Sequence, residues 1–156
     1  MTRSPTALFV AEGLALDQFT GRLTAFNILD SIFAPALPAR LPRIHVVGIY
    51  ELQPKASELL AMVEILGPGG ASVSEPTSIH IQFGARTVGL PPVSHTTIHT
   101  FWNIAFREEG DHRVRLSQRT DAGQEWVVVQ ELALAVVRAR HPLAQDPANA
   151  GKPQEE

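Results

Sequence analysis

The sequence contains no cysteine. Disulfide bonds, thiol catalysis and thiolate metal sites are therefore excluded, because each of them needs a cysteine sulfur. No run of about 18 apolar residues occurs, which is the length that a membrane-spanning helix requires. The N-terminal residues also lack the apolar core and the small-residue cleavage site of a secretion signal. These absences predict a cytoplasmic protein with no membrane segment.

Positive charge is scarce as well. Thirteen lysines and arginines stand against sixteen aspartates and glutamates, and the net charge is −3. Part of the acidic excess lies near the C-terminus, in Asp146, Glu155 and Glu156, so the rest of the chain is close to neutral. A nucleic-acid-binding protein needs a basic face, so we expect no nucleic-acid partner.

The chain has 156 residues, of which 44% are hydrophobic, and this is enough for one domain with a real core. Short apolar segments recur about every ten residues, with turn residues between them. This rhythm predicts an all-β fold, a two-sheet antiparallel β-sandwich of about eight strands, with a small β-barrel as the alternative. We expect this domain to span residues 1–138. Residues 139–156 offer nothing to bury and are predicted to be a disordered tail.

The most informative stretch begins at residue 8. Residues 8–16 and 22–28 read as two strands, and Asp17, Thr20 and Gly21 supply the turn between them, because Asp and Thr side chains bond nearby amides and Gly accepts a positive φ. Asn27 is expected to satisfy backbone groups where the second strand ends. A helix over residues 20–33 is the alternative.

Three parts of this region resemble a known family. They are the run Asp17-x-x-Thr20-Gly21-Arg22-Leu23-Thr24-x-Phe26-Asn27, the run Pro38-x-x-Leu41-Pro42, and the apolar strand from His45 to Tyr50. The chain resembles, mainly over residues 8–52, an uncharacterised bacterial family that is labelled only as a domain of unknown function. That resemblance implies a small all-β domain. It implies no catalytic or binding residues.

Further along, residues 34–42 contain three prolines and are predicted to cross from one sheet to the other. Residues 58–66 and 131–137 fit a strand or a helix, and we favour strands. Residues 96–106, 112–118 and 124–130 predict a meander with three-residue turns at 109–111 and 121–123.

The expected meander has a specific register. Placing the apolar even-numbered residues on one face puts Phe106 opposite Val114, Leu116 opposite Val128 and Gln118 opposite Trp126. The same phase places Ile98, Trp102, Ile104 and Phe106 together in the core. It turns His99 and Phe101 toward the other, partner-facing side.

Candidate binding residues follow from these phases. Arg107, Arg113, Arg115 and Arg119 form a basic stripe that could bind an anion or a partner, unless Glu125 or Glu131 neutralises it across the strands. His99 and Phe101 could belong to an apolar contact face. His80, His95 and His99 could hold a metal only if neighbouring strands brought them together, since four residues of strand span about 13 Å.

No arrangement of serine, histidine and carboxylate resembles a nucleophile turn. We therefore expect no catalytic residues, no metal and no cofactor. The sequence favours a non-enzymatic protein-binding or assembly module, with a protein partner or self-association. A metal-dependent enzyme using His80, His95 and His99 is one alternative. A small-ligand or carbohydrate binder using Trp102 or Trp126 is the other.

Overall fold

The computed structural model describes residues 3–51, 57–84 and 94–139. Within these ranges the chain forms nine strands and no helix, so no helix long and apolar enough to cross a membrane is found there. The strands are β1 (Ala7–Leu16), β2 (Leu23–Leu29), β3 (Ser31–Ala34), β4 (Ala39–Glu51), β5 (Ser57–Leu66), β6 (Thr77–Phe83), β7 (Ser94–Phe106), β8 (Gly110–Arg119) and β9 (Val127–Arg138). The predicted tail lies outside the described residues except for Ala139.

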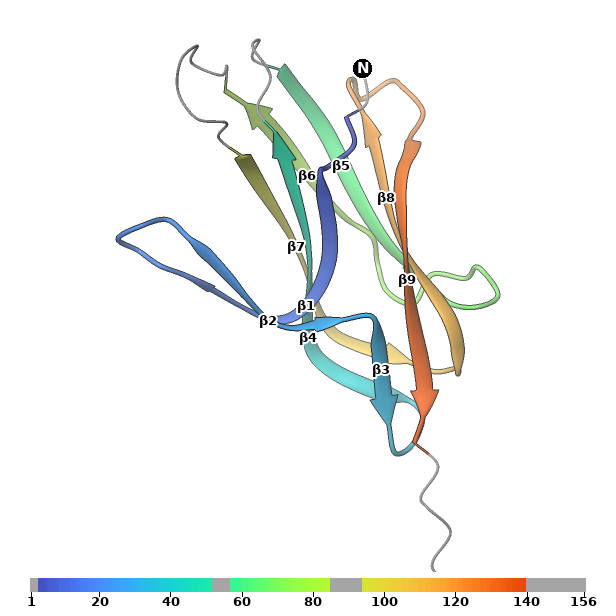
Figure 1. Cartoon of the computed structure of the whole chain (residues 1–156). Helices are drawn as coiled ribbons and strands as arrows, with labels where there is room; N and C mark the ends of the chain where they lie inside the picture. Colours follow the sequence, from blue (N-terminus) through green and yellow to red (C-terminus); the bar gives the residue numbers. More distant parts are fainter. Residues whose placement is uncertain (1–2, 52–56, 85–93, 140–156) are drawn as a thin grey trace, which may run out of the picture.

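The strands form two sheets packed against each other (Figure 1). Sheet A has the strand order β2-β1-β4-β7, and sheet B has the order β3-β9-β8-β5-β6. The predicted all-β sandwich is confirmed, with one strand more than the expected eight. β3 runs parallel to β9, whereas the other pairs in the described ranges are antiparallel.

The core fills the space between the sheets. In β5 every second residue from Leu59 to Ile65 is buried, and this period of two identifies residues 58–66 as a strand, as predicted. Residues 131–137, the other ambiguous segment, lie inside β9. Sheet A contributes Tyr50 and Phe106, the two largest of the fully buried side chains.

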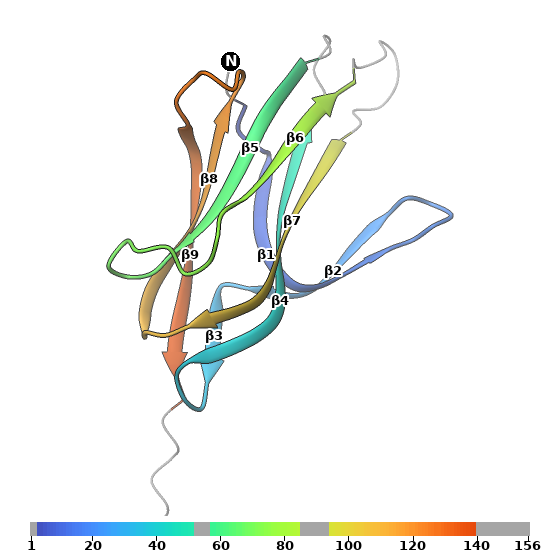
Figure 2. The ribbon, with the colours of Figure 1, turned by 180° about the vertical axis from the view of Figure 1, so that it is seen from behind.

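The first predicted hairpin is confirmed. β1 pairs with β2 from Val10 opposite Leu29 to Leu16 opposite Leu23. β1 pairs with β4 only as far as Ala11, so the rest of the hairpin has no third strand beside it. This part, residues 12–28, projects from the two sheets in both opposite views (Figures 1 and 2), and we call it the arm.

The proline-rich stretch crosses between the sheets, as predicted, because it connects β3 of sheet B to β4 of sheet A. Only residues 35–38 lie outside strands, however, since β4 already begins at Ala39 and includes Pro42. β1 does not pair with this end of β4. Proline has no N–H to donate, and a strand edge is where it can be accommodated.

The predicted hairpin at residues 109–111 is wrong. β7 pairs with β4 in sheet A, while β8 pairs with β5 and β9 in sheet B. Residues 107–109 therefore connect the two sheets. Phe106 and Val114 both lie in the core, but on opposite sheets. A shared inward phase does not distinguish two strands of one sheet from two strands of facing sheets.

The predicted second hairpin exists as the β8–β9 pair, but its register differs. Leu116 lies opposite Gln130 rather than Val128, and Gln118 is paired one residue away from Trp126. The register shifts at a β-bulge directly after Leu116. The predicted three-residue turn at 121–123 is wrong, because the connection spans residues 120–126, and this displaces the register by one residue at Gln118. The bulge sets two residues of one strand against one of the other, which displaces Leu116 by one residue more.

Strand β7 reverses its side-chain alternation part-way along. Asn103 has a left-handed φ of 51°, and both Asn103 and Trp102 are exposed. Ile98 and Trp102 were predicted to share the core with Ile104, but they face outward and are 40% and 65% exposed. A left-handed residue breaks the strict two-residue period of an extended strand. Trp126, also predicted in the core, is half-buried outside β9.

Candidate binding surface

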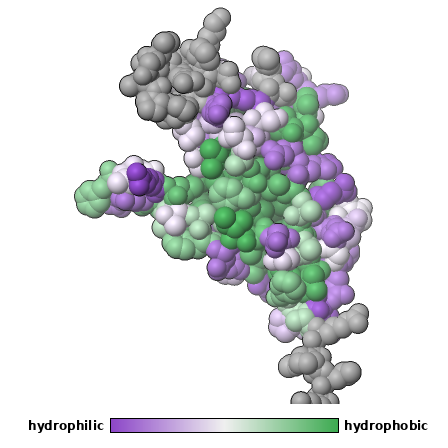
Figure 3. Space-filling view, viewed as in Figure 1, coloured by the Kyte–Doolittle hydropathy of each residue, from purple (hydrophilic) through white to green (hydrophobic). Residues whose placement is uncertain are grey.

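The outer side of sheet A, which we call outer face A, is largely apolar. Cross-strand pairing places these residues on it: Phe9, Ala11, Ile28, Arg43, His45, Val47, Ile98, Thr100 and Trp102. Val47 is 0% exposed although no second layer is described over it, since Phe9 and Ile98 lie directly opposite it on the two neighbouring strands. Hydrophobic surface gathers over β1 and beside the arm (Figure 3).

The polar groups of outer face A are mostly satisfied within it. His45 Nδ1 lies 2.9 Å from the Thr100 hydroxyl oxygen. Burial, and secondly the positive charge of Arg43, lowers the pKa of His45, so its ring is neutral at pH 7. The Arg43 guanidinium lies over the Trp102 ring at 6.0 Å from its centroid. The centre of the face is therefore uncharged, with one cation near its margin.

The arm carries further exposed hydrophobic side chains. Leu16, Phe19, Phe26 and Ile28 are 64%, 99%, 51% and 64% exposed. A two-stranded hairpin by itself is at best marginally stable in water. Such an arm gains stability when another surface covers its hydrophobic side chains.

The arm ends in a tightly bonded turn. The Asp17 carboxylate accepts hydrogen bonds from the amides of Phe19, at 2.8 Å, and Thr20, at 3.2 Å. A hydrogen bond from the Thr20 hydroxyl and these two amide bonds lower the pKa of Asp17. Gly21 has a φ of 66°, and the Arg22 amide donates to the Thr20 hydroxyl oxygen at 3.4 Å.

Asn27 lies inside β2 and not at its end. It has a φ of 51°, and its Nδ2 donates to the Glu12 carboxylate at 2.9 Å. The expectation that Asn27 satisfies backbone groups at the strand end is therefore wrong. It lies opposite Glu12, just beyond the point where β1 leaves β4.

On the outer side of sheet B, outer face B, the arginines of β8 are engaged by neighbouring side chains. Arg115 Nε donates to Glu131 at 2.7 Å, and Arg113 lies 4.0 Å from the same carboxylate. The Arg119 guanidinium stacks over the Trp126 ring at 4.3 Å. Of the two glutamates that could neutralise the basic stripe, Glu131 is the one that pairs with it.

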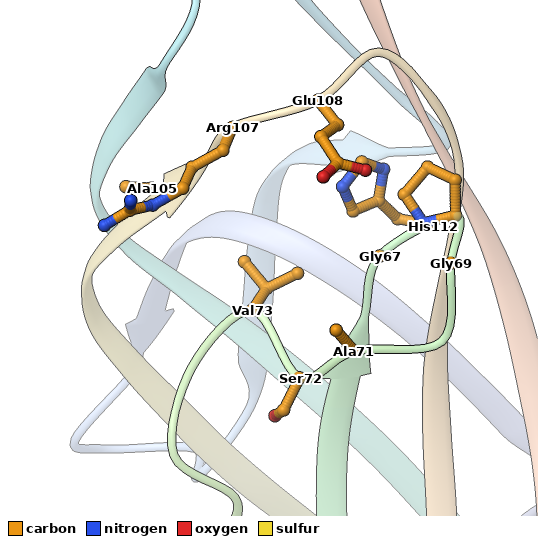
Figure 4. A pocket seen from close by; sticks show the side chains of 10 residues that line it. Gly67, Gly69, Ala71, Ser72, Val73, Ala105, Arg107, Glu108 and His112 are labelled. Carbon is orange, nitrogen blue, oxygen red and sulfur yellow. The ribbon is translucent and has the colours of Figure 1, made fainter.

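Arg107 does not belong to that stripe. It lies on the connection between β7 and β8 and not opposite Arg113, because these two strands do not pair. It lines a cavity of about 210 Å³ together with Glu108, His112 and the loop after β5 (Figure 4). The Arg107 side chain extends away from Glu108 and His112.

This cavity is smaller than the usual range for small-molecule sites, about 300–1,000 Å³. The Ser72 hydroxyl in its wall donates to the Ser74 carbonyl at 2.6 Å. His112 Nδ1 lies 3.2 Å from the Gly110 carbonyl oxygen. The Ser72 and His112 side chains thus each interact with a nearby backbone carbonyl. They do not form a nucleophile and base pair in this cavity.

The histidines proposed as a metal face are separated. His80 lies on outer face B, 3.3 Å from Glu58. His95 packs against Phe83 of the core, and His99 is 2% exposed between the sheets. Among the described residues no three potential metal ligands converge.

His99 and Phe101 were predicted on the partner-facing side, and this is wrong. Both are inward, at 2% and 3% exposure. His99 Nδ1 lies 3.1 Å from the Thr77 hydroxyl oxygen, and burial lowers the pKa of His99 to about 4. The exposed hydrophobic residues of this strand are Ile98 and Trp102.

A comparison with protein families assigns the chain to a family. Residues 6–142 match the family of unknown function DUF6941. The chain belongs to this family. The match covers all nine strands and is wider than the opening region on which the sequence resemblance depends. No curated protein matches the sequence.

Sequence reasoning missed the surface that this DUF6941 chain exposes. The informative signal is the repeated pattern aromatic-Asn-Ile, in Phe26-Asn27-Ile28 and Trp102-Asn103-Ile104. Asparagine is a poor strand residue that adopts left-handed φ more readily than most others. In both places it does so, and in β7 it turns the tryptophan toward solvent.

Proposed function

We propose that this DUF6941 chain is a non-enzymatic protein-binding or assembly module that contacts its partner with the arm and outer face A. The observation that carries the proposal is the distribution of exposed hydrophobic side chains. Six of the ten large ones in the described ranges lie on these two surfaces. They are Leu16, Phe19, Phe26, Ile28, Ile98 and Trp102.

The chemistry of the surface fits a protein partner. Interfaces combine aromatic anchors with few charges at their centre and polar groups at their margin. Trp102, Phe26 and Phe19 supply aromatic anchors, and Arg43 supplies a marginal charge. Outer face B is more mixed. Its arginines are engaged by Glu131 and Trp126, while Phe33 and Val137, which lie opposite each other, are 71% and 41% exposed.

Site-specific photocrosslinking in the cells that carry the protein tests the proposal. A photoreactive phenylalanine analogue replaces Phe19, Phe26 or Trp102 in turn, and Ser78 on outer face B is the control position. We expect discrete covalent adducts from the first three positions and none from Ser78. Mass spectrometry of each adduct then identifies the partner.

Equal labelling from all four positions, or no adduct from any, would contradict the proposal. Each variant must first show the unfolding midpoint of the wild type, so that an adduct does not come from unfolded chain. An adduct with a second copy and an adduct with a different protein both support binding. The first adduct would identify the partner as another copy of the chain, and the second would identify it as a different protein.

One observation supports a second candidate, a small-ligand or carbohydrate site. Trp102 is 65% exposed, and an exposed indole can stack against the apolar face of a ring. Titration of tryptophan fluorescence with a panel of oligosaccharides tests this. A saturable change that is lost in Trp102→Ala but kept in Trp126→Phe would favour the ligand site over the protein interface.

A further inference from the structure

One sheet edge of this sandwich is left without protection. An edge strand presents unpaired N–H and C=O groups, which pair readily with another chain unless they are covered, short or charged. On one side of the sandwich the edge strands β6 and β7 lie against each other. On the other side β3 has only four residues. β2, with seven residues, is the long edge that remains.

β2 also lacks the usual devices against pairing. Residues Leu23–Leu29 include no charged residue and no proline. The strand belongs to the projecting arm, so the described part of the chain places no strand along its outer edge (Figures 1 and 2). Phe26 and Ile28 within it are about half exposed or more. This edge is therefore accessible, uncharged and apolar.

Opposite charges stand at the two ends of this edge. Arg22 precedes β2 and Asp30 follows it, and both are exposed. Neither forms an ion pair with another described residue. Both lie four positions from Phe26. If two β2 strands pair antiparallel about Phe26, Arg22 of each copy therefore lies opposite Asp30 of the other.

The hydrogen bonding of the arm fits this register. The amide of Asp17 donates to the Arg22 carbonyl at 2.9 Å, which makes this a hydrogen-bonded pair. Bonded and non-bonded pairs alternate along an antiparallel ladder, so the backbone groups of Phe26 point toward Gly13 of β1. The groups of Leu23 and Ala25 then point to the free edge. Two Phe26 residues would meet as a non-bonded pair.

The left-handed Asn27 does not prevent such pairing. β1 and β2 keep one register on both sides of Asn27, and β4 and β7 keep one register on both sides of Asn103. The fold thus shows twice that an antiparallel neighbour follows a strand through this kink.

We infer that two copies of this chain pair through their β2 strands, antiparallel and centred on Phe26, with two symmetric contacts between Arg22 of one copy and Asp30 of the other. The inference rests on the proposed function and names the partner as a second copy. It extends sheet A across two subunits into one eight-stranded sheet, because each copy contributes four strands. The symmetry is that of a closed dimer.

Charge reversal tests the predicted register on the purified full chain. Light scattering over a concentration series should give twice the chain mass of 17.0 kDa for the wild type. Arg22→Asp and Asp30→Arg should each weaken the dimer by roughly 10-fold or more, because like charges then face each other across the strands. The double variant restores opposite charges and should return to within about 3-fold of the wild type by the same pairing rule.

The absence of native cysteine allows a second test. Phe26→Cys should form an intermolecular disulfide under mild oxidation, because non-bonded antiparallel pairs bring Cα atoms to about 4.5 Å. Thr24→Cys should not, since Thr24 lies opposite Ile28 of the other copy. Ser78→Cys on outer face B measures the background of random collisions.

Three results would overturn the inference. The first is a wild type that stays monomeric at about 500 μM, a concentration well above the dissociation constant expected of a specific dimer. The second is a double variant that dimerises no more tightly than either single variant. The third is a Phe26→Cys chain that cross-links no faster than Ser78→Cys. The proposed function fails separately. A monomeric chain that still photocrosslinks to a different protein through the arm would retain the binding role and exclude the self-pairing.

Discussion

The two outer faces of this sandwich differ in the side chains that they expose to water. Outer face B is exposed to water and holds its arginines in place with Glu131 and Trp126. Outer face A keeps Val47 fully buried under its neighbours and leaves Ile98 and Trp102 open. A contiguous exposed apolar surface favours a partner. This difference supports the proposal that sheet A, with its arm, is the binding side.

The largest expected effect is a loss of stability at acid pH that originates in sheet A. Burial lowers the pKa of His99 in sheet A to about 4 from its usual 6.5. The unfolded chain therefore takes up a proton at a higher pH than the folded chain does. The free energy of unfolding should be fully retained above pH 7 and should fall by about 3 kcal/mol between pH 6.5 and pH 4 from this residue.

Urea unfolding at several pH values measures this contribution. His99→Leu should show a correspondingly smaller loss of stability between pH 7 and pH 4 than the wild type. Parallel pH profiles of the two proteins would contradict the assignment.

A smaller effect compares the outer faces directly. Val47→Ala should cost about 2 kcal/mol, because it removes two methyl groups from a fully buried position. Met62→Ala at a partly buried position of outer face B should cost less than about 1 kcal/mol. Chemical denaturation of both variants checks the pair. Equal costs would mean that outer face A is no better packed than outer face B.

Asn103 determines which side of β7 faces outward. Substitutions that differ in how well they tolerate its left-handed φ test that role. Asn103→Val should destabilise the protein by about 1–2 kcal/mol, since a β-branched residue is strained at a φ of 51°. Asn103→Gly removes the side chain but tolerates the conformation, so it should cost less. Thermal unfolding separates the two, and a valine variant as stable as the glycine variant would argue against the kink.

The smallest effect belongs to the ion pairs of outer face B. Glu131→Gln should lower the free energy of unfolding by about 0.5 kcal/mol, because partly exposed salt bridges contribute little. The difference from the wild type should shrink at high salt, where these charges are screened. A salt-independent loss would indicate that Glu131 acts through packing.

Local signals predicted a large part of the fold. The turn residues Asp17 to Gly21 predicted the first hairpin, and the prolines of residues 34–42 predicted the crossing between sheets. The strand character of residues 58–66 also followed from the pattern. Each of these depends on backbone chemistry within a few residues, which the sequence states directly.

The candidate surface could not be derived in the same way. The residues proposed to bind, His99 and Phe101, are buried, while Ile98 and Trp102 are exposed. The error comes from one residue, because Asn103 reverses the alternation and the only local sign of this is the short aromatic-Asn-Ile pattern. The arginines were correctly recognised as a stripe on β8, but Arg107 was assigned to it through a hairpin that does not form.

The sequence by itself determined the all-β class, the positions of most strands and the neutral, cysteine-free chemistry of the chain. These follow from hydrophobic alternation and turn residues, which act locally. Only the tertiary structure decided which strands are neighbours and which side of β7 is exposed to solvent. It also decided that β2 is an unpaired sheet edge. Those features depend on contacts between segments far apart in the chain, where the same alternating pattern fits more than one partner.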